Sequence, residues 1–378
     1  MTPRPGGSPR RIEFQGGGPF YAELKLRVKG LLDEPGRARR AQAHMYAKSA
    51  VMVVWVVASW AGLVFVADSL WQGALLAVSL GLALAGVGFN ITHDANHGSY
   101  SPHPRLNRAM AWSMDLIGAS SYVWRTKHNT AHHTFTNISG ADSDIDSMPF
   151  ARFAPDQPRR RYHRYQHVYM WLLYGLFAIK WHTLGDFSYL RDGRIGETPL
   201  KRPRGGDLVG FCLGKALFVG WALVIPLVLH PLWQVALVFG VVSFVLAFTL
   251  AVTFQLAHCL EEAEFASIDE MAGAGPAEWA RHQVETTVDF APRNRFLAWY
   301  LGGLNFQIEH HLFSRVCHTH YPAMAEVVRE VCVRHGIRHQ AHPGLRPALA
   351  SHTRWLRRMG APVATDGREG QPAGATAP

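Results

Sequence analysis

Apolar residues are concentrated in two long blocks of the chain, residues 50–91 and 208–257. Polar residues interrupt the first block at Asp68 to Gln72, and His230–Pro231 interrupts the second. Each half of a block is long enough for a helix of roughly 20 residues, the length needed to cross the hydrocarbon core of a bilayer. The pattern predicts an all-α integral membrane protein with four transmembrane helices in two hairpins, at residues 50–69, 72–91, 208–229 and 232–257.

Basic residues lie almost entirely outside these spans. Of the 38 Lys and Arg residues, all but Lys215 lie in residues 1–50, 92–207 and 259–378, and the two hairpin tips have none. Cytoplasmic segments of membrane proteins carry the excess of basic residues, so we expect both termini and the middle loop in the cytoplasm, at a cell inner membrane. The net charge of +10 reflects this topology and attraction to anionic lipid headgroups, and nucleic acid is not expected as a partner. Lys215 is expected to extend from the third span to the cytoplasmic interface.

The segments around the spans suggest one domain between two tails. Residues 1–19 and 360–378 are rich in Gly and Pro and are predicted to be disordered, which leaves residues 20–359 as the folded domain. Residues 20–49 are predicted to form one amphipathic, basic helix near the membrane surface. Residues 168–190 are apolar but contain three charged or polar interruptions, so we predict an interfacial helix there and not a fifth span.

Eight histidines fall in pairs and trios next to the predicted spans. They are His93 and His97 in HDANH, His128, His132 and His133 in HNTAHH, His258 at the end of the fourth span, and His310 and His311 in QIEHH. Four spans place all of them on one side of the membrane. In an α-helix residues i and i+4 share a face, so His93 and His97 should point together. The same rule pairs His128 with His132 and turns His133 away, toward a second metal.

So many imidazoles in one place indicate a metal site. Buried histidines with hydrogen-bonded ring nitrogens at helix ends would explain one such pair. They would not explain eight histidines that the predicted topology brings to one side of the membrane. Imidazole binds zinc, copper, iron and nickel, and zinc normally takes four ligands, so eight ring nitrogens suggest two metal ions. Two irons with nitrogen ligands suit the activation of dioxygen, which amino acids cannot perform.

Carboxylates near these motifs are candidates to orient the histidines by accepting the second ring N–H. Asp94 and Glu309 lie inside the motifs, and Asp142, Asp144 and Asp146 follow HNTAHH. Histidines outside the motifs receive simpler interpretations. His318 and His320 are expected to pack near the site or to support a ligand, and surface or interfacial positions are expected for His182, His230, His282, His335, His339 and His342.

Three segments, HDANH, KHNTAHHTFTN and GGLNFQIEHHLF, resemble the three histidine boxes of the integral-membrane fatty acid desaturases. The resemblance covers residues 50–340 and is greatest to the acyl-CoA and front-end branch, where the third box begins with Gln. It implies a mushroom-shaped helical fold with a cytoplasmic cap, two bound irons and an acyl-chain tunnel. It implies that Gln307 is a weak ligand or a group that supports a ligand. The iron ligands that it implies are His93, His97, His128, His132, His133, His258, His310 and His311.

The resemblance also implies a reaction. Dioxygen is the co-substrate, and two electrons are supplied to it. Two hydrogens are removed from adjacent methylenes, so that a cis double bond forms in the acyl chain of a fatty acyl-CoA or a membrane acyl-lipid. No haem-binding HPGG segment precedes the spans, so we expect a separate electron donor, which can be a ferredoxin, a flavodoxin-type reductase or a cytochrome.

Two other functions stay open at this point. A fatty acid hydroxylase or other monooxygenase on the same di-iron scaffold shares the first hydrogen abstraction, although the QIEHH form of the third box favours a desaturase. A non-catalytic membrane metal or haem carrier is more remote, because it would need histidines within opposing spans or ionisable groups at mid-membrane.

Overall fold

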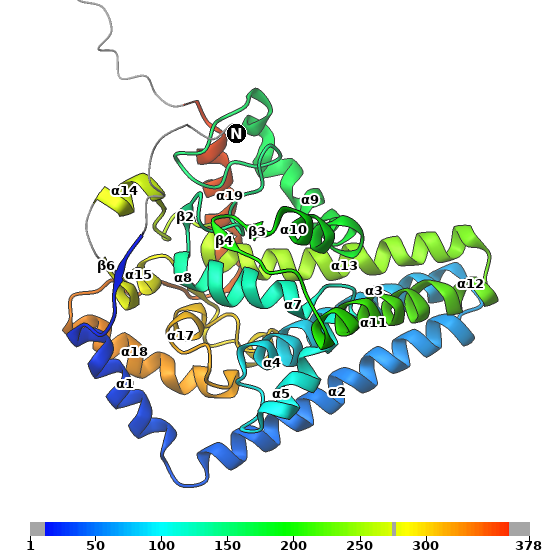
Figure 1. The fold of residues 1–378 in the computed structure, drawn as a ribbon, viewed down its shortest axis with the longest axis horizontal. Helices are drawn as coiled ribbons and strands as arrows, with labels where there is room; N and C mark the ends of the chain where they lie inside the picture. Colours follow the sequence, from blue (N-terminus) through cyan, green and yellow to red (C-terminus); the bar gives the residue numbers. More distant parts are fainter. Residues whose placement is uncertain (1–11, 274–276, 363–378) are drawn as a thin grey trace, which may run out of the picture.

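The computed structural model describes residues 12–273 and 277–362. Within them, four helices are long and apolar enough to cross a membrane, which confirms the predicted number of spans. They lie side by side in Figure 1 and extend away from the rest of the chain. Their bounds are Arg37–Phe65 (α2), Leu70–His97, Gly206–Leu229 and Leu232–His258 (α13).

Two of the spans contain a π-helical segment. In the second span α3 (Leu70–Val87) passes through Gly88–Thr92 into α4 (His93–His97). In the third, α11 (Gly206–Val219) passes through Gly220–Val224 into α12 (Ile225–Leu229). The two hairpin turns fall at the polar breaks seen in the sequence, between Phe65 and Leu70 and between Leu229 and Leu232.

The spans pack through small and apolar residues. Met52 of α2, Leu84 of α3 and Leu246 of α13 belong to one buried apolar cluster. Gly81 lets α3 approach α13, because a Cβ atom there would lie 2.9 Å from the carbonyl oxygen of Val242. Many apolar side chains on the outer faces of the spans are exposed, as expected for helices surrounded by lipid.

The remaining helices gather at one end of the spans and form a cap (Figure 1). Short helices dominate it, and two further π-helical segments, Arg125–His132 and Trp181–Gly185, continue helices within it. Two short 3₁₀ helices are Arg161–Tyr165 and His318–His320. The α-helices of the cap are α1 (Pro19–Leu32), α5 (Pro104–Ala111), α6 (Ser113–Leu116), α7 (Ser121–Trp124), α8 (His133–Phe135), α9 (Gln166–Lys180), α10 (Asp186–Asp192), α14 (Ile268–Gly273), α15 (Trp279–Glu285), α16 (Arg295–Tyr300), α17 (Gln307–Leu312), α18 (Tyr321–Arg334) and α19 (Leu345–Gly360).

Strands are limited to two-residue pairs that link distant parts of the cap. Three pairs are parallel (β1 with β6, β2 with β5, β7 with β8), and β3 pairs with β4 in an antiparallel hairpin. The strands are β1 (Phe14–Gln15), β2 (Ile138–Ser139), β3 (Arg194–Ile195), β4 (Thr198–Pro199), β5 (Ala266–Ser267), β6 (Ala277–Glu278), β7 (Asp289–Phe290) and β8 (Ala341–His342).

The predicted single helix at residues 20–49 is wrong. Helix α1 ends at Leu32, and the chain turns at Gly36, which has a φ of 75° that favours glycine. Helix α2 begins at Arg37, so residues 37–49 continue directly into the first span. Helix α1 instead packs on the cap, where Phe20 and Leu24 join an apolar cluster of α15, α17 and α18.

Most of the two predicted tails lies outside the described residues. In the part that is described, Phe14–Gln15 form β1, Pro19 begins α1, and Gly360 ends α19. β1 pairs with β6 through backbone groups that no hydrophobic pattern marks, and the boundaries of the folded domain stay a prediction.

Residues 168–190 form α9, a π-helical segment and α10, and they are not among the four candidate spans of the described chain. Lys215 of the third span reaches cap residues. Its Nζ donates to Oδ2 of Asp186 at 2.6 Å and to the carbonyl of Gly118 at 2.8 Å. Lys215 thus ties the third span to α10, and its extension to the membrane interface stays a prediction.

Candidate metal centre

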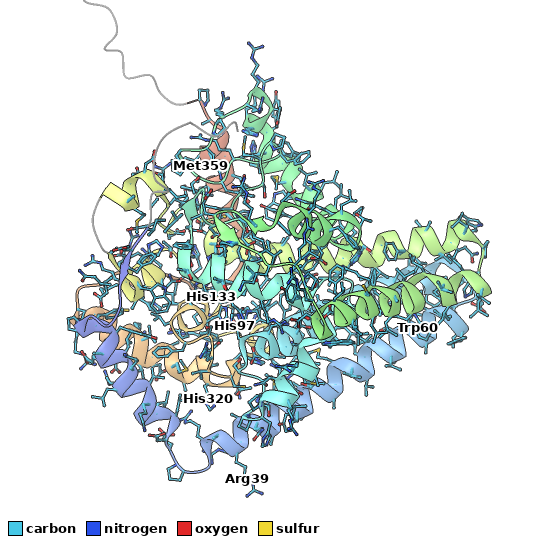
Figure 2. All side chains as sticks on the ribbon, in the orientation of Figure 1. Arg39, Trp60, His97, His133, His320 and Met359 are labelled. Carbon is cyan, nitrogen blue, oxygen red and sulfur yellow. The ribbon has the colours of Figure 1, made fainter. Side chains whose placement is uncertain are left out.

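The eight histidines of the sequence motifs meet where the cap joins the spans. They come from α4, the π-helical segment Arg125–His132, α8, the last residue of α13, and α17. Each is at most 9% exposed. Figure 2 labels His97 and His133 close together in the interior. The convergence expected from counting spans is therefore present in the structure.

Their ring nitrogens form two adjacent groups. Four histidines offer ligand atoms within 4.8 Å of one another, namely His93, His97, His128 and His310. A second group of three is His132, His258 and His311. His133 falls in a further group with His310 and His311, which places it between the other two. The arrangement has room for two metal ions, each with histidines from different elements.

The backbone around HNTAHH differs from the expected α-helix. Arg125–His132 is π-helical, with hydrogen bonds from residue i to i+5, so His128 and His133 come to share a face. Their Nε2 atoms lie 3.2 Å apart. His128 and His132 stack at 5.3 Å between ring centroids, and with Asp144 they offer ligand atoms within 4.8 Å of one another. The predicted pair is therefore present, but His133, which was expected to turn away from His128, approaches it as well. In α4 the predicted pair is correct, since the rings of His93 and His97 lie 4.7 Å apart.

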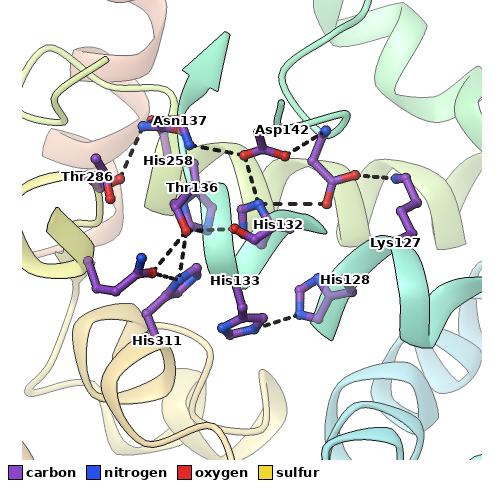
Figure 3. Close-up of polar contacts among 12 residues, drawn as sticks. Lys127, His128, His132, His133, Thr136, Asn137, Asp142, His258, Thr286 and His311 are labelled. Atoms are coloured by element: carbon purple, nitrogen blue, oxygen red, sulfur yellow. Dashed lines mark hydrogen bonds and ion pairs between the residues drawn. The ribbon is translucent and has the colours of Figure 1, made fainter. Parts of the chain in front are cut away.

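Second ring nitrogens are held by polar groups behind the histidines (Figure 3). Nδ1 of His132 lies 2.9 Å from Oδ2 of Asp142, and Nδ1 of His311 lies 2.8 Å from Oε1 of Gln283. Nδ1 of His310 lies 3.3 Å from the hydroxyl of Tyr321. Such contacts fix the ring orientation and leave Nε2 directed at the centre of the cluster.

Asp142 is itself held in place. Its carboxylate accepts backbone N–H groups from Asn137 at 3.1 Å and Asp144 at 2.9 Å. Lys127 forms an ion pair with Asp144 beside it. Burial alone would lower the pKa of His132, but the Asp142 carboxylate and its hydrogen bond raise it. Asp142 thus performs the role expected of a carboxylate in this segment, whereas Asp146 accepts from the backbone of Met148.

The carboxylates inside the other two boxes have different surroundings. Asp94 lies 3.6 Å from Nδ1 of His93 and 2.9 Å from Nδ1 of His318. Glu309 faces His339 at 3.8 Å, and burial raises its pKa to about 7. Gln307 is buried, and its Oε1 has no hydrogen-bond partner among the described residues.

Three residues that support the site were not found from the sequence, namely Thr136, Gln283 and Tyr321. Thr136 donates to Gln283 at 3.0 Å, which completes the contact behind His311. Gln283 and Tyr321 lie in no spaced motif, so no sequence signal marked them, whereas Thr136 lies inside the segment KHNTAHHTFTN. His282, expected at the surface, is buried, and its Nε2 lies 2.9 Å from the carbonyl of Thr136.

The histidine cluster fits a bound cation. Nε2 of His132, His310 and His311 is buried without a hydrogen-bond partner in the described chain, and so are both ring nitrogens of His258. A buried polar atom left unpaired is unfavourable, so these nitrogens indicate a missing positive partner. Burial and the neighbouring rings lower the pKa of His128, His133, His310 and His311 well below its usual value. Neutral imidazole is the form that binds metal.

A cavity of about 810 Å³ opens beside the cluster. His97, His133 and His311 lie in its wall. Three arginines, Arg108, Arg125 and Arg315, line it as well, and no acidic residue of the described chain does. None of these arginines forms an ion pair with another described residue, so the cavity has a positive lining.

These features define a class of protein: a multi-pass membrane protein with a buried polyhistidine site suited to metal. Residues 69–343 match the sequence profile of the Fatty acid desaturase family, which is most of the chain. The chain belongs to this family and is a membrane-bound oxidoreductase that desaturates fatty acyl groups.

Similar proteins include enzymes named for lipid-linked substrates. The chain is 38% identical to the sn-1 linoleoyl-lipid 6-desaturase of Arthrospira platensis over 90% of this chain and 92% of that protein. It is 34% identical to the protein of the same name in a Synechocystis strain, over 93% and 98%. It is 35% identical to the acyl-lipid (8-3)-desaturase of Physcomitrium patens, over 90% and 72%.

Proposed function

We propose that the eight clustered histidines hold two irons and that the enzyme desaturates the acyl chains of membrane acyl-lipids. The observation that carries the proposal is the division of the histidines into two adjacent groups with unpartnered ring nitrogens. Two irons bound there would supply the activation of dioxygen, which no side chain provides. The metal ligands in this proposal are His93, His97, His128, His132, His133, His258, His310 and His311.

The protein's own contribution is positioning and exclusion of water. Asp142, Gln283 and Tyr321 hold three ligating rings so that each presents Nε2 to the metal. The near-complete burial of the cluster keeps bulk water from a strong oxidant. One C–C bond of the substrate must lie next to the cluster for both hydrogens to be removed from adjacent methylenes.

The cavity beside His97, His133 and His311 is the proposed route for the substrate's carboxyl end. Its three unpaired arginines suit an anionic group such as a phosphate on the acyl carrier. The relatives named above act on lipid-linked chains, which favours an acyl-lipid over acyl-CoA.

The cap is proposed to face the cytoplasm, where the basic residues lie, and to accept electrons from a separate donor. A basic cap favours an acidic donor. An acidic ferredoxin, flavodoxin-type reductase or cytochrome would each fit this charge.

The proposal is tested by expressing the protein in a bacterial host grown in air with iron and analysing total fatty acids by gas chromatography–mass spectrometry. Wild type is compared with His132→Ala and His311→Ala, with a donor system co-expressed. His103→Ala is the matched control, because His103 is exposed and outside the cluster. We expect a new unsaturated acid with wild type and control and none with either cluster variant, although all four proteins reach the membrane.

The outcomes separate the alternatives. Full activity in either cluster variant would overturn the ligand assignment. A hydroxy acid in place of the unsaturated acid would show a hydroxylase. When the host is fed a labelled fatty acid, its desaturated product should appear first in glycerolipid. If that product appears first in acyl-CoA and only later in glycerolipid, the acyl-lipid assignment is wrong.

A further inference from the structure

A buried chain of polar groups joins the first span to His93. Lys48 of α2 is 2% exposed, and its Nζ lies 2.7 Å from Nε2 of His318. Nδ1 of His318 lies 2.9 Å from Oδ2 of Asp94, which also accepts the backbone N–H of His318 at 3.2 Å. The other oxygen of Asp94, Oδ1, lies 3.6 Å from Nδ1 of His93. Hydrogen-bond distances thus join Lys48, His318 and Asp94, and the Asp94 carboxylate faces Nδ1 of His93 across a longer contact.

The direction of each hydrogen bond follows from the groups involved. An ionised carboxylate only accepts, so Nδ1 of His318 carries the proton that it donates to Asp94. Nε2 of the neutral ring is then an acceptor, and the ammonium of Lys48 donates to it. Burial lowers the pKa of His318, with Lys48 assisting and Asp94 opposing, which agrees with a neutral ring.

We propose that Lys48 and His318 are positioning residues that hold the Asp94 carboxylate against Nδ1 of His93 and so direct Nε2 of His93 toward its histidine group. The inference rests on the proposed function, since it takes His93 as a metal ligand. His93 is then oriented by a carboxylate, as His132 is by Asp142, although the contact of 3.6 Å is longer than the 2.9 Å at His132. The difference is that Asp94 is held by His318, from a segment more than 200 residues away, and that His318 is in turn held by Lys48 of another span.

The charges explain why a cation is kept in this buried position. An isolated ammonium within a span is strongly unfavourable, and an opposite charge linked through hydrogen bonds offsets that cost. Lys48 meets the negative charge of Asp94 through the imidazole of His318. The ring of Trp299 lies 5.7 Å from the Lys48 ammonium and adds a further favourable contact.

A third metal site at this place is disfavoured. Asp94, Cys317 and His318 do offer ligand atoms within 4.8 Å of one another. However, the Lys48 ammonium already occupies Nε2 of His318 and would repel a metal cation. The thiol of Cys317 lies 3.1 Å from Oγ1 of Thr319, and burial raises its pKa to about 12, so it is protonated. The groups are therefore satisfied by one another without an ion.

Two substitutions of His318 test the proposal because they mimic different ring nitrogens. In His318→Asn the amide nitrogen stands near the position of Nδ1 and can still donate to Asp94. In His318→Gln the amide stands near Nε2, so Asp94 loses its side-chain donor. The measurements are iron per purified protein, the rate of iron loss to a chelator, and the thermal unfolding temperature.

We expect about half of the iron in His318→Gln to be lost roughly 10- to 100-fold faster than in wild type. This half is the iron bound by the group that contains His93. His318→Asn should lose iron at close to the wild-type rate. The matched control is His320→Gln, a buried histidine two residues along the same turn without a contact to Asp94, which should behave as wild type. Equal iron loss from wild type, His318→Gln and His318→Asn would overturn the proposal.

If His318→Gln does not fold, Lys48 supplies the decisive pair. Lys48→Arg keeps a charged donor for His318, whereas Lys48→Met removes it at similar length. Faster iron loss from Lys48→Met than from Lys48→Arg supports the proposal, and equal loss overturns it. A folded wild type that binds no iron would overturn both the proposed function and the positioning role of Lys48 and His318. An iron-loaded wild type whose variants lose iron at the same rate overturns only the positioning role.

Discussion

At the scale of residues, the histidines are alike in the sequence but differ in what stands behind them. Asp142 supports His132, an amide supports His311, a phenol supports His310, and Asp94 lies behind His93. A carboxylate partner raises the basicity of a ligating ring more than an amide does. Each of the two histidine groups therefore contains one ring with a carboxylate behind it, His93 in one and His132 in the other.

Gln283 gives a direct test of these partners. In Gln283→Leu, Nδ1 of His311 loses the shorter of its two contacts and keeps the Thr136 hydroxyl at 3.2 Å, and we expect metal affinity and activity to fall by up to roughly 10- to 100-fold. Gln283→Glu keeps an acceptor at that position and should retain most of both. Iron content and desaturation are measured side by side. A Gln283→Leu protein with wild-type iron affinity would contradict this role for Gln283.

His352 allows a pH prediction. Its Nδ1 donates to the carbonyl of Cys259 at 2.7 Å, and its Nε2 accepts from the hydroxyl of Tyr174 at 2.9 Å. Burial lowers the pKa of His352 to about 4, below its ordinary value of 6.5. The unfolded chain therefore binds the proton more readily, so the stabilising effect is complete above pH 6.5 and is lost as pH falls toward 4. The loss amounts to roughly 3 kcal/mol.

The measurement compares unfolding temperatures in detergent at pH 7.5 and pH 4.5. His352→Gln should be less stable than wild type at pH 7.5 but should lose less stability on acidification. Identical pH dependence of wild type and His352→Gln would show that His352 does not titrate in this range.

At the scale of elements, the π-helical segments decide where histidines point. Gly88–Thr92 precedes His93 directly, and Arg125–His132 carries the second box. A π-helical turn contains about one residue more than an α-helical turn, so the side chains that follow it are rotated about the helix axis. This geometry brings His133 to His128, while His132 offers a ligand atom both beside His128 and in the group with His258 and His311.

Gly302 packs directly against the first π-helical segment, Gly88–Thr92. Its φ is 59°, and a Cβ atom there would overlap the carbonyl oxygen of Phe89, with the carbonyl carbon at 2.8 Å. We expect Gly302→Ala to destabilise the protein by more than about 2 kcal/mol and to weaken iron binding, since the segment that leads to His93 must move.

Gly193→Ala is the matched control for this prediction. Gly193 also has a positive φ, 67°, but nothing lies within 4 Å of an added Cβ atom. The Gly193→Ala substitution should lower the free energy of unfolding by only about 1 kcal/mol, from backbone strain alone, and should leave iron binding unchanged. Thermal unfolding and iron content distinguish the two; equal effects would show that the contact with Phe89 is unimportant.

At the scale of the whole molecule, an even number of spans places every histidine at one end. The second and fourth spans both end in a cluster histidine, His97 and His258, and the cap closes over them. Cap segments far apart in sequence are joined through short strand pairs such as β2 with β5 and β7 with β8. The site therefore depends on the complete domain and not on any one motif.

The orientation of this molecule in the membrane is open to a labelling test. In a protein without native cysteines, Asp68→Cys places a thiol at the tip of the first hairpin and Arg105→Cys places one in the cap, both at exposed positions. With the cap in the cytoplasm, an impermeant maleimide should label Asp68→Cys in intact cells and Arg105→Cys only after permeabilisation. The reverse pattern would invert the proposed topology.

The sequence by itself determined the number of spans, the gathering of the motif histidines at one end of the spans and the identity of all eight clustered residues. These follow from hydrophobic length and residue type, which are local properties of the chain. The tertiary structure decided how the histidines are grouped, because the π-helical geometry of Arg125–His132 has no mark in the residue pattern. It also decided which partners stand behind the rings, since contacts such as Lys48 with His318 and Gln283 with His311 join segments that only packing brings together.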